Sequence, residues 1–547
     1  MPTIEVDLSD LNRLLGEKLS LEELRNPLQN LGIEIEGMTA EGLKLEVQHN
    51  RPDLYGVEGV ARALRGYLGI ETGVPEYELK EPDMKLEVDS SLEGLRPVAV
   101  MAVIENAEFD DASLKAIMDL QEKLHKILGR ERQKISIGAY DLDGIEPPIR
   151  YTTTPPDGIN FVPLEFDEKL SPQEILETHP KGREYSHLVE EFDRYPILLD
   201  SAENVLSMPP IINSHTARVT ASTEKIGVDV TGINEKVANE AMNVIMAAAT
   251  EREFDIRAVE VEYPDRQFQT PRLVEEERCF DLDQANAWLG LDLSQKEVVE
   301  IIERMRYDFI GKEDGDLRVK VPFYRSDLMH GVDLFEDIAV GFGYDKLEPV
   351  LPPIETTGEP NSVEEISVIA RRALTGLGFT EVIPYMLTNS RLNFEMMRTE
   401  GEAVTIKNPV SEEYTILRTW LLPGLMDVLR QNRHHKLPQK IFEVGDVVLL
   451  DGGSETGAKN VRRAAGAIIG EESDFTYIRS IAESLLRELQ TDWTLKPYNH
   501  PSLLEERAAE FLVDDENIGF VGEVHPEVIL NFELEHPVAV FELDLPE

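Results

Sequence analysis

Two proline-rich connectors constrain most strongly how this chain folds, because each interrupts a run of helix and strand signals. They read EYPDRQFQTPRL (residues 262–273) and LEPVLPPIETTGEP (residues 347–360). Proline lacks a backbone N–H and restricts the residue before it, so neither a helix nor a central strand continues through such a segment. At 547 residues the chain has room for several domains of roughly 100–200 residues each. The sequence therefore predicts an α+β multidomain protein.

Four domains are predicted around these connectors. Residues 1–75 form an N-terminal α/β module, in which Ser20 and Glu23 have capping-box spacing at the start of a helix over 20–31. Residues 76–268 form a mixed-sheet domain, with strand-like runs PVAVMAVI, KISIGAY, RVTAS and IGVDVTG and a helix over 234–249. Residues 269–348 outline a winged-helix-like module, because helices over 282–289 and 295–305 precede the strand signals of DLRVKVPFY. Residues 349–547 alternate helices and strands up to VAVFELDL.

The chain is strongly acidic, yet it keeps enough apolar residues for large cores. Asp and Glu number 105 against 54 Lys and Arg, a formal net charge of −51, while 41% of residues are hydrophobic. Because the acidic excess is spread along the whole chain, it indicates folded domains with a surface suited to the high-salt cytoplasm of a halophile. The single cysteine, Cys279, forms no internal disulfide, and no run of about 18 apolar residues occurs. We expect a cytoplasmic protein without a membrane segment.

Four carboxylates gather in RSDLMHGVDLFEDIAVGFGY (residues 325–344). On a helix starting near residue 333, Asp333, Glu336 and Asp337 share one face, and Asp327 lies six residues before it. Oxygen ligands of this kind suit a hard cation such as Mg²⁺. The alternative is structural, because Asp333 and Glu336 also resemble an acidic capping box, and carboxylates in a first turn are favoured by the helix dipole. Both interpretations stay open from spacing alone.

A second polar cluster surrounds the strand-like run IGVDVTG. Strand alternation places Asp229 and Thr231 on one face and Val228 and Val230 on the other. A polar run on the preceding loop consists of Asn213, Ser214, His215 and Thr216. The sequence contains no phosphate-loop motif, no dinucleotide fingerprint after a strand and no Ser/His/Asp signature. These two clusters are therefore the candidate sites.

The carboxylate stretch resembles the metal-associated module of the phenylalanyl-tRNA synthetase β-subunit family. Other segments follow in that family's order: HNRPDLYGVEGVARAL resembles its N-terminal module, and RTWLLPGLMDVLRQN its C-terminal domain. The segments SIGAYDLDGI and SMPPIINSHTARVT resemble its editing region. The resemblance covers nearly the whole chain and is closest to the shorter archaeal and eukaryotic type. It implies an editing domain over 76–268, and a class II synthetase-like antiparallel-sheet domain over 349–547.

The resemblance also implies partners and cofactors. Carried across, the Mg²⁺ ligands are Asp327, Asp333, Glu336 and Asp337. A catalytic α subunit would bind ATP and phenylalanine in an (αβ)₂ assembly that charges tRNA(Phe). We expect the last domain to be degenerate, without an ATP site, because KIFEVGDV lacks an arginine before its acidic residue. The end FELDLPE likewise lacks a glycine-rich, arginine-containing segment.

The family's editing activity gives the polar cluster a function. An apolar pocket for phenylalanine cannot strongly exclude tyrosine, whereas a site built to bind the hydroxyl can demand it. We expect Asp229 to bind the tyrosine hydroxyl of mischarged tRNA, with the other pocket residues being Asn213, Ser214, His215, Thr216 and Thr231. Two alternatives stay open: a freestanding trans-editing hydrolase and a non-catalytic tRNA-binding scaffold. Basic islands at 126–134 and 430–440 are either contacts for tRNA or the α subunit, or solvated faces.

Overall fold

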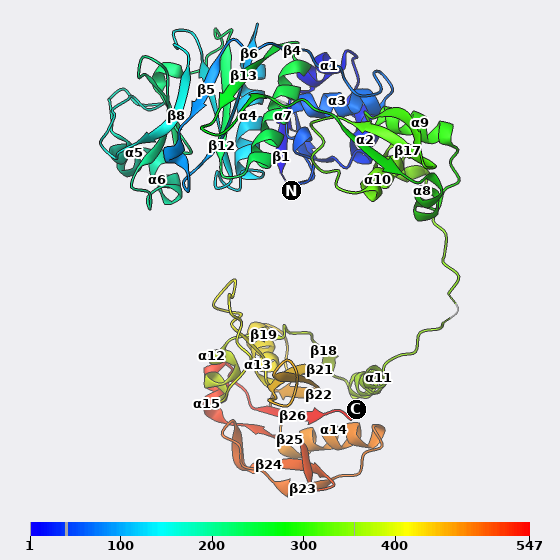
Figure 1. The fold of residues 1–547 in the computed structure, drawn as a ribbon. Coiled ribbons are helices and arrows are strands. Elements are labelled where there is room, and N and C mark those ends of the chain that lie inside the picture. Colours follow the sequence, from blue (N-terminus) through cyan, green and yellow to red (C-terminus); the bar gives the residue numbers. More distant parts are fainter. Residues whose placement is uncertain (1, 39–41, 355, 547) are drawn as a thin grey trace. The chain divides into compact units, whose positions relative to one another are not determined.

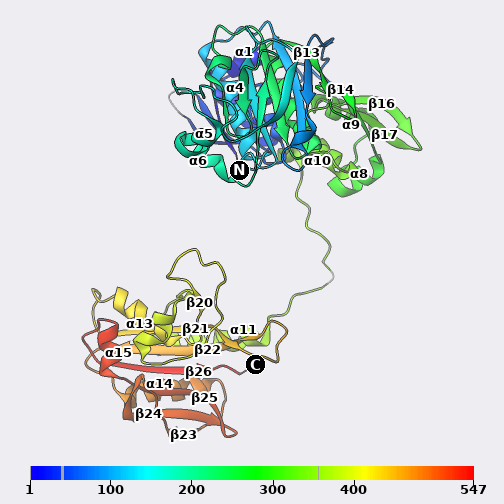
Figure 2. The same ribbon diagram turned by 60° about the vertical axis from the view of Figure 1, so that its left-hand side comes forward.

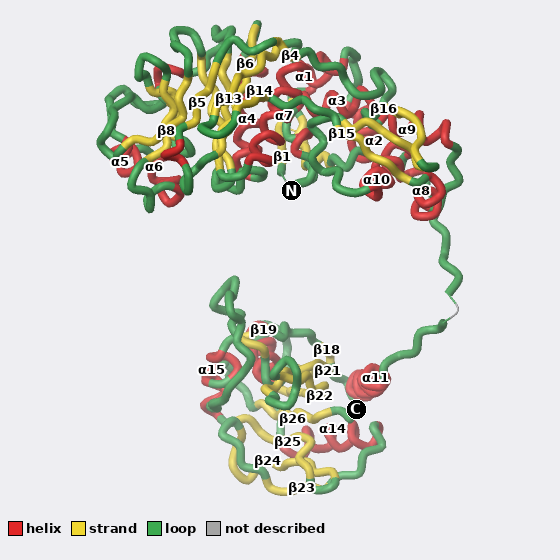
Figure 3. The backbone as a smooth tube through the Cα atoms, in the orientation of Figure 1, coloured by secondary structure: helices red, strands yellow, loops and turns green. Residues whose placement is uncertain are grey.

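The computed structural model describes residues 2–38, 42–354 and 356–546. The chain divides into two compact units, one ending at Val350 and the other beginning at Leu351 (Figure 1). The division falls inside the second proline-rich connector, residues 347–360. Several separate sheets, each with its own helices, confirm the α+β multidomain class (Figure 3).

Unit 1 begins with a three-stranded sheet of order β1-β3-β2, covered by three helices. The Ser20–Glu23 capping box forms as predicted at the start of α2. The elements are β1 (Thr3–Val6), α1 (Leu8–Leu15), α2 (Leu21–Asn30), β2 (Glu34–Met38), β3 (Leu43–Glu46), the 3₁₀ turn η1 (Pro52–Leu54) and α3 (Val57–Tyr67).

An eleven-stranded mixed sheet dominates unit 1 (Figure 2). Its main path runs β11-β10-β9-β8-β5-β13-β6-β12-β7, with β4 and β14 also pairing with β13. The strands are β4 (Leu79–Lys80), β5 (Lys85–Val88), β6 (Val98–Glu105), β7 (Ile135–Asp141), β8 (Ile149–Thr154), β9 (Tyr195–Leu199), β10 (Val205–Met208), β11 (Ile212–Asn213), β12 (Ile226–Gly232), β13 (Asp255–Glu262) and β14 (Gln267–Thr270). The helices are α4 (Asp111–Lys126), α5 (Pro172–Thr178), α6 (Pro180–Tyr185) and α7 (Glu235–Glu251).

The two ends of this sheet come together. The side chain of Asn213, on the edge strand β11, donates a 3.1 Å hydrogen bond to the carbonyl of Ala139 on the opposite edge strand, β7. The central strand β12 pairs with both β6 and β7. Its Val228 and Val230 enter the core beneath α7, as the alternation predicts. The segment RVTAS, predicted as a strand, is instead a loop in which Thr220 bonds to Thr223.

The last part of unit 1 is a small module with a β15-β17-β16 sheet. The Ser294–Glu297 capping box forms as predicted. Its core is continuous with that of the preceding segments, since one cluster of buried side chains runs from Ile4 to Ile338. The four domain ranges drawn from the sequence therefore stay a prediction. The elements are β15 (Glu276–Phe280), α8 (Leu282–Leu289), α9 (Gln295–Arg304), β16 (Asp308–Glu313), β17 (Asp316–Val321) and α10 (Gly331–Phe342).

Unit 2 is built on a seven-stranded sheet of order β18-β21-β22-β26-β25-β24-β23, beside a β19-β20 pair. Helices α11 and α14 pack on one face, and α13 and α15 on the other. The strands are β18 (Thr380–Glu381), β19 (Leu387–Thr388), β20 (Ile416–Leu417), β21 (Gln439–Leu450), β22 (Ala458–Ile469), β23 (Thr494–Pro497), β24 (Leu503–Val513), β25 (Glu516–Val524) and β26 (Val538–Asp544). The helices are α11 (Ser362–Gly376), α12 (Ser390–Asn393), α13 (Leu422–Gln431), α14 (Phe475–Glu488) and α15 (Pro526–Asn531).

Candidate functional site

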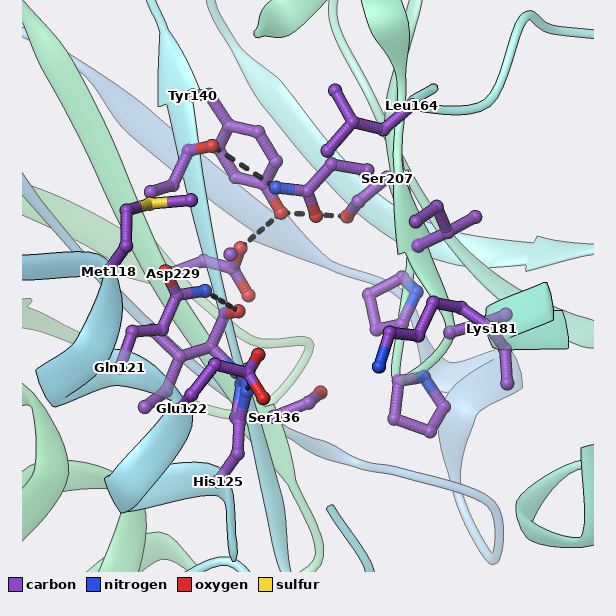
Figure 4. A pocket seen from close by; sticks show the side chains of 18 of the residues that line it. Met118, Gln121, Glu122, His125, Ser136, Tyr140, Leu164, Lys181, Ser207 and Asp229 are labelled. Carbon is purple, nitrogen blue, oxygen red and sulfur yellow. Dashed lines mark hydrogen bonds and ion pairs between the residues drawn. The ribbon is translucent and has the colours of Figure 1, made fainter. Parts of the chain in front are cut away.

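A cavity of about 470 Å³ lies where the two ends of the large sheet meet (Figure 4). Strands β7 and β12 form one wall, and β10 with the loop that follows it forms another. Apolar side chains from α4 and from the segment before α5 contribute to the lining, among them Met118 and Leu164. The cavity therefore combines apolar walls with polar groups from β7, β10 and β12.

Asp229 is the acidic residue in the wall of this cavity that comes from β12. Its side chain is 1% exposed, and the hydroxyl of Tyr140 donates a short hydrogen bond to its Oδ1 atom. The same hydroxyl lies 2.7 Å from Oγ of Ser207. A carboxylate, a phenol and a serine hydroxyl thus join β12, β7 and β10 in one buried chain of hydrogen bonds.

Burial dominates the electrostatics of Asp229. It raises the pKa of the carboxyl to about 7, although the hydrogen bond from Tyr140 and the positive charge of Arg96 act in the opposite direction. Arg96 is itself buried, and it donates to the carbonyl of Thr231 at 3.2 Å and to Oγ of Ser136 at 3.3 Å. Near neutral pH, Asp229 consequently exchanges between an ionised acceptor and a neutral acid.

Helix α4 and the segment after it form the side of the cavity that carries charge. The ring of His125 accepts the N–H of Ile137 at 2.7 Å through Nε2, which places its proton on Nδ1, 3.2 Å from Oε1 of Glu122. Arg132 donates to the same Oε1 at 3.0 Å. Its other terminal nitrogen donates to the carbonyls of Pro210 and Ile211. Arg132 therefore ties α4 to the loop after β10.

These contacts also determine the charge states of Glu122 and His125. The hydrogen bond with His125, together with the charge of Arg132, lowers the pKa of Glu122 to about 2. Burial lowers the pKa of His125, which keeps the imidazole neutral at pH 7. The wall thus presents an ionised carboxylate already held by an arginine.

The structure brings together three of the six pocket residues predicted from the sequence. Asp229, Thr231 and Asn213 line the cavity. Ser214, His215 and Thr216 are not among the residues that line it, and their role in the pocket stays a prediction. The chain turns away after Asn213 into a 3₁₀ turn over His215–Ala217, in which the Ser214 hydroxyl accepts the N–H of Thr216. His215 and Thr216 are exposed on this turn.

Tyr140, Ser207 and Gly138 were not predicted as site residues, because nothing local links β7 and β10 to β12. The roles of Glu122 and His125 were not predicted either. The basic island at 126–134 pointed to the region, but Arg132 is buried and serves the cavity wall. In the island at 430–440, Arg430 and Arg433 form ion pairs with carboxylates, and Lys440 bonds to a tyrosine hydroxyl.

Two of the four carboxylates of residues 327–337 pair with a buried arginine, Arg325, that was not among the predicted site residues. Arg325 donates to both oxygens of Asp327 at 2.8 Å and to Oδ2 of Asp337 at 2.7 Å. Burial alone would raise the pKa of Asp327, but Arg325 holds it to about 2. Asp333 accepts the N–H groups of Met329 and His330 at 2.7 Å.

The helix cap therefore involves Asp333 and His330 rather than Asp333 and Glu336. Glu336 is exposed. Within residues 2–38, 42–354 and 356–546, no three metal-ligating side chains converge on one point. The donor chemistry still fits Mg²⁺ in part: the hydrogen bonds to Asp333 and Asp337 all use Oδ2, so their Oδ1 atoms and the Glu336 carboxylate have no hydrogen bond among the described residues. A shared Mg²⁺ site stays a prediction.

In the described part of the chain, no helix has the length and apolar character needed to cross a membrane.

Comparisons with known proteins agree with this architecture. A model described as "Phe-tRNA synthetase beta subunit B1 domain" matches residues 1–70, and one described as "tRNA synthetase B5 domain" matches residues 279–344. The "Phenylalanyl tRNA synthetase beta chain CLM domain" model matches residues 347–545.

Full-length relatives and a solved structure extend the match. The phenylalanine–tRNA ligase beta subunit of Methanocaldococcus jannaschii is 41% identical over 553 residues, covering 100% of both chains. That of Methanosarcina barkeri is 41% identical over 548 residues, covering 100% of this chain and 99% of its own. A crystal structure of an N-terminal fragment of the Pyrococcus horikoshii β subunit matches with a TM-score of 0.61 and 40% identity, covering 63% of this chain and 100% of the fragment. The chain therefore belongs to the family of phenylalanine–tRNA ligase beta subunits.

Proposed function

We propose that this subunit proofreads for the ligase: it hydrolyses tyrosine that has been mischarged onto tRNA(Phe), in the cavity between β7, β10 and β12. The observation that carries the proposal is the buried carboxylate of Asp229 in the wall of a cavity of about 470 Å³ whose lining also includes apolar side chains such as Met118 and Leu164. Apolar walls suit an aromatic ring, and an acceptor at one end suits its hydroxyl. A site of this kind demands the hydroxyl that a phenylalanine pocket cannot exclude.

The reaction is the hydrolysis of an ester. Water adds to the acyl carbon, the bond from that carbon to the ribose oxygen breaks, and the ribose oxygen takes up a proton. The chain's part in this proposal is to bind the side chain and orient the ester, and no side chain is assigned as the general base. Thr231 and Asn213 stand beside Asp229 in the cavity wall as further polar contacts.

The test is Asp229→Ala in the complex reconstituted with the α subunit. We expect the hydrolysis of tyrosyl-tRNA(Phe) to fall by about a hundredfold or more while charging with phenylalanine is retained, since the lost contact is to the hydroxyl alone. Asp157→Ala, at an exposed loop position of the same unit, is the matched control. Unchanged hydrolysis in Asp229→Ala would remove the residue from the site.

We further propose that unit 2 is a scaffold that pairs with the α subunit in an (αβ)₂ assembly in the cytoplasm, where the α subunit binds ATP and charges tRNA(Phe). Large apolar side chains of unit 2 stand in solvent, with Ile383 88% and Tyr385 77% exposed. Exposed apolar groups of this size are typical of a protein interface. Size-exclusion chromatography of the co-expressed chains in molar salt tests this: a freestanding hydrolase would elute alone.

Two observations support the absence of ATP chemistry in unit 2. Hydrophobic clusters cover both faces of its sheet. In a cavity of about 690 Å³ in this unit, two of the lining arginines are already paired with carboxylates: Arg418 with Glu443 and Arg430 with Asp427. A triphosphate needs arginines that are free to meet its charge. We expect no ATP–pyrophosphate exchange by this chain without the α subunit.

We also propose that Mg²⁺, when bound, is held by Asp333, Glu336 and Asp337 on α10, where it would offset their mutual repulsion. Asp327 is engaged by Arg325 and contributes to the same charge cluster. The support is the donor chemistry of these oxygens and their position on one face of a helix.

A further inference from the structure

Tyr140 hydrogen-bonds to one of the two carboxylate oxygens of Asp229. Its hydroxyl is bonded to Oδ1 of Asp229, and Figure 4 shows the second carboxylate oxygen turned away from it. No hydrogen bond from the described residues reaches Oδ2, and Asp229 is part of the cavity lining. Oδ2 is therefore the oxygen available to a ligand.

The approach of Tyr140 to Asp229 depends on the absence of a side chain between them. Gly138 is the cross-strand partner of Asp229 in the β7-β12 ladder. A Cβ atom at residue 138 would lie 2.0 Å from the Tyr140 hydroxyl oxygen and 2.2 Å from Oδ1 of Asp229, far inside van der Waals contact. Because residue 138 is a glycine, the Tyr140 hydroxyl has room to reach the Asp229 carboxylate.

Resting on the proposed proofreading function, we propose that Tyr140 is a positioning residue for selectivity. It holds Asp229 with one oxygen towards the cavity and favours its ionised form, so that only a substrate ring carrying a hydroxyl is accepted. Oγ of Ser207, on β10, lies 2.7 Å from the Tyr140 hydroxyl oxygen and holds the phenol in this position.

The selectivity follows from the cost of leaving a buried charge unpaired. An ionised Asp229 gains a hydrogen bond from tyrosine, but against a phenylalanine ring its free oxygen would be desolvated without compensation. A neutral Asp229 carries no such penalty and would tolerate either ring. Without the Tyr140 hydroxyl, Arg96 alone would oppose the effect of burial, which raises the pKa of Asp229. The carboxyl of Asp229 would then stay neutral to higher pH.

The charged and titratable groups around Asp229 come from several elements. Tyr140 is on β7, Tyr151 on β8 and Arg96 before β6, and each interacts electrostatically with the carboxyl. Among the lining residues further along the cavity are Asp119, Glu122, His125, Arg132, Glu165 and Lys181. Among the described residues that face Asp229 directly, Tyr140 alone hydrogen-bonds to its carboxylate.

The test compares Tyr140→Phe with wild type in the reconstituted complex. The hydrolysis rates of tyrosyl-tRNA(Phe) and phenylalanyl-tRNA(Phe) are measured from pH 6 to pH 9, and their ratio removes the hydroxide dependence that both esters share. We expect the ratio to fall by about tenfold or more, and its rise with pH to move to higher pH. Tyr263→Phe is the matched control, because its hydroxyl bonds to the backbone of Ala99 away from the cavity.

A second variant keeps the outcome decisive if Tyr140→Phe does not fold. Gly138→Ala keeps the Tyr140 hydroxyl in the protein, but the added methyl group would push it away from Asp229. We expect the same fall in the ratio of tyrosyl-tRNA(Phe) to phenylalanyl-tRNA(Phe) hydrolysis. A wild-type ratio and pH profile in folded Tyr140→Phe or Gly138→Ala would overturn the role of Tyr140. If wild type itself hydrolyses neither ester, the proposed proofreading fails instead, so the two failures are distinguishable.

Discussion

Asp229→Asn should make the protein more stable at alkaline pH while removing its selectivity for tyrosine. Burial raises the pKa of Asp229 from its usual value near 4 to about 7. One pKa unit corresponds to about 1.4 kcal/mol, so ionising this carboxyl in the folded protein costs about 4 kcal/mol. Asparagine keeps an acceptor for the Tyr140 hydroxyl and has no charge to bury.

The sign of the pH dependence follows from proton binding. Because the folded-state pKa is the higher one, the folded protein binds more protons than the unfolded chain between about pH 4 and pH 7. Wild type therefore loses stability as pH rises through that window. The advantage of Asp229→Asn should be near zero below pH 4 and should approach about 4 kcal/mol above pH 7.

Urea unfolding of wild type and variant, followed by circular dichroism at pH 5, 6, 7 and 8 in constant salt, measures this difference. Asp157→Asn, at an exposed loop position of the same unit, should show a small difference that does not vary with pH. A difference between Asp229→Asn and wild type that is equal at pH 5 and pH 8 would refute the argument that burial of Asp229 controls its charge.

Three further predictions concern the charged groups. Arg325→Met should destabilise unit 1 by about 3–5 kcal/mol in thermal or urea unfolding, because Asp327 and Asp337 would remain buried without their partner; a loss below 1 kcal/mol would contradict this. Arg132→Met should lower tyrosyl-tRNA(Phe) hydrolysis by about tenfold or more with charging unchanged, since the loop after β10 loses its tie to α4. Mg²⁺ should raise the melting temperature of the complex, and Glu336→Gln should reduce that increase; equal increases in both proteins would exclude Glu336 as a ligand.

Several features of the fold follow from the sequence because their causes are local. The Ser20–Glu23 and Ser294–Glu297 capping boxes formed as predicted, since each joins residues three positions apart. The alternation along β12 correctly placed Asp229 and Thr231 opposite the core side chains, because strand periodicity is a property of the backbone. The division of the chain falls in a proline-rich connector for the same kind of reason.

The site itself was settled by contacts between distant segments. Tyr140 and Ser207 are 67 residues apart, and Tyr140 and Asp229 are 89 apart, so no local pattern brings their side chains together. The polar run Ser214–Thr216 illustrates the converse, since its residue types suit a pocket, yet none of the three lines the cavity beside Asp229. Arg325 was likewise overlooked beside its carboxylates.

The sequence alone thus determined the class of fold, the family resemblance and the face of β12 that carries the acidic residue. Which side chains surround that residue, and what charge it carries, follow from the folded chain and not from its sequence pattern. The physical reason is that the closure of the large sheet, which creates the cavity and buries Asp229, depends on how β7 and β10 meet, and burial is a property of the assembled sheet rather than of any one strand.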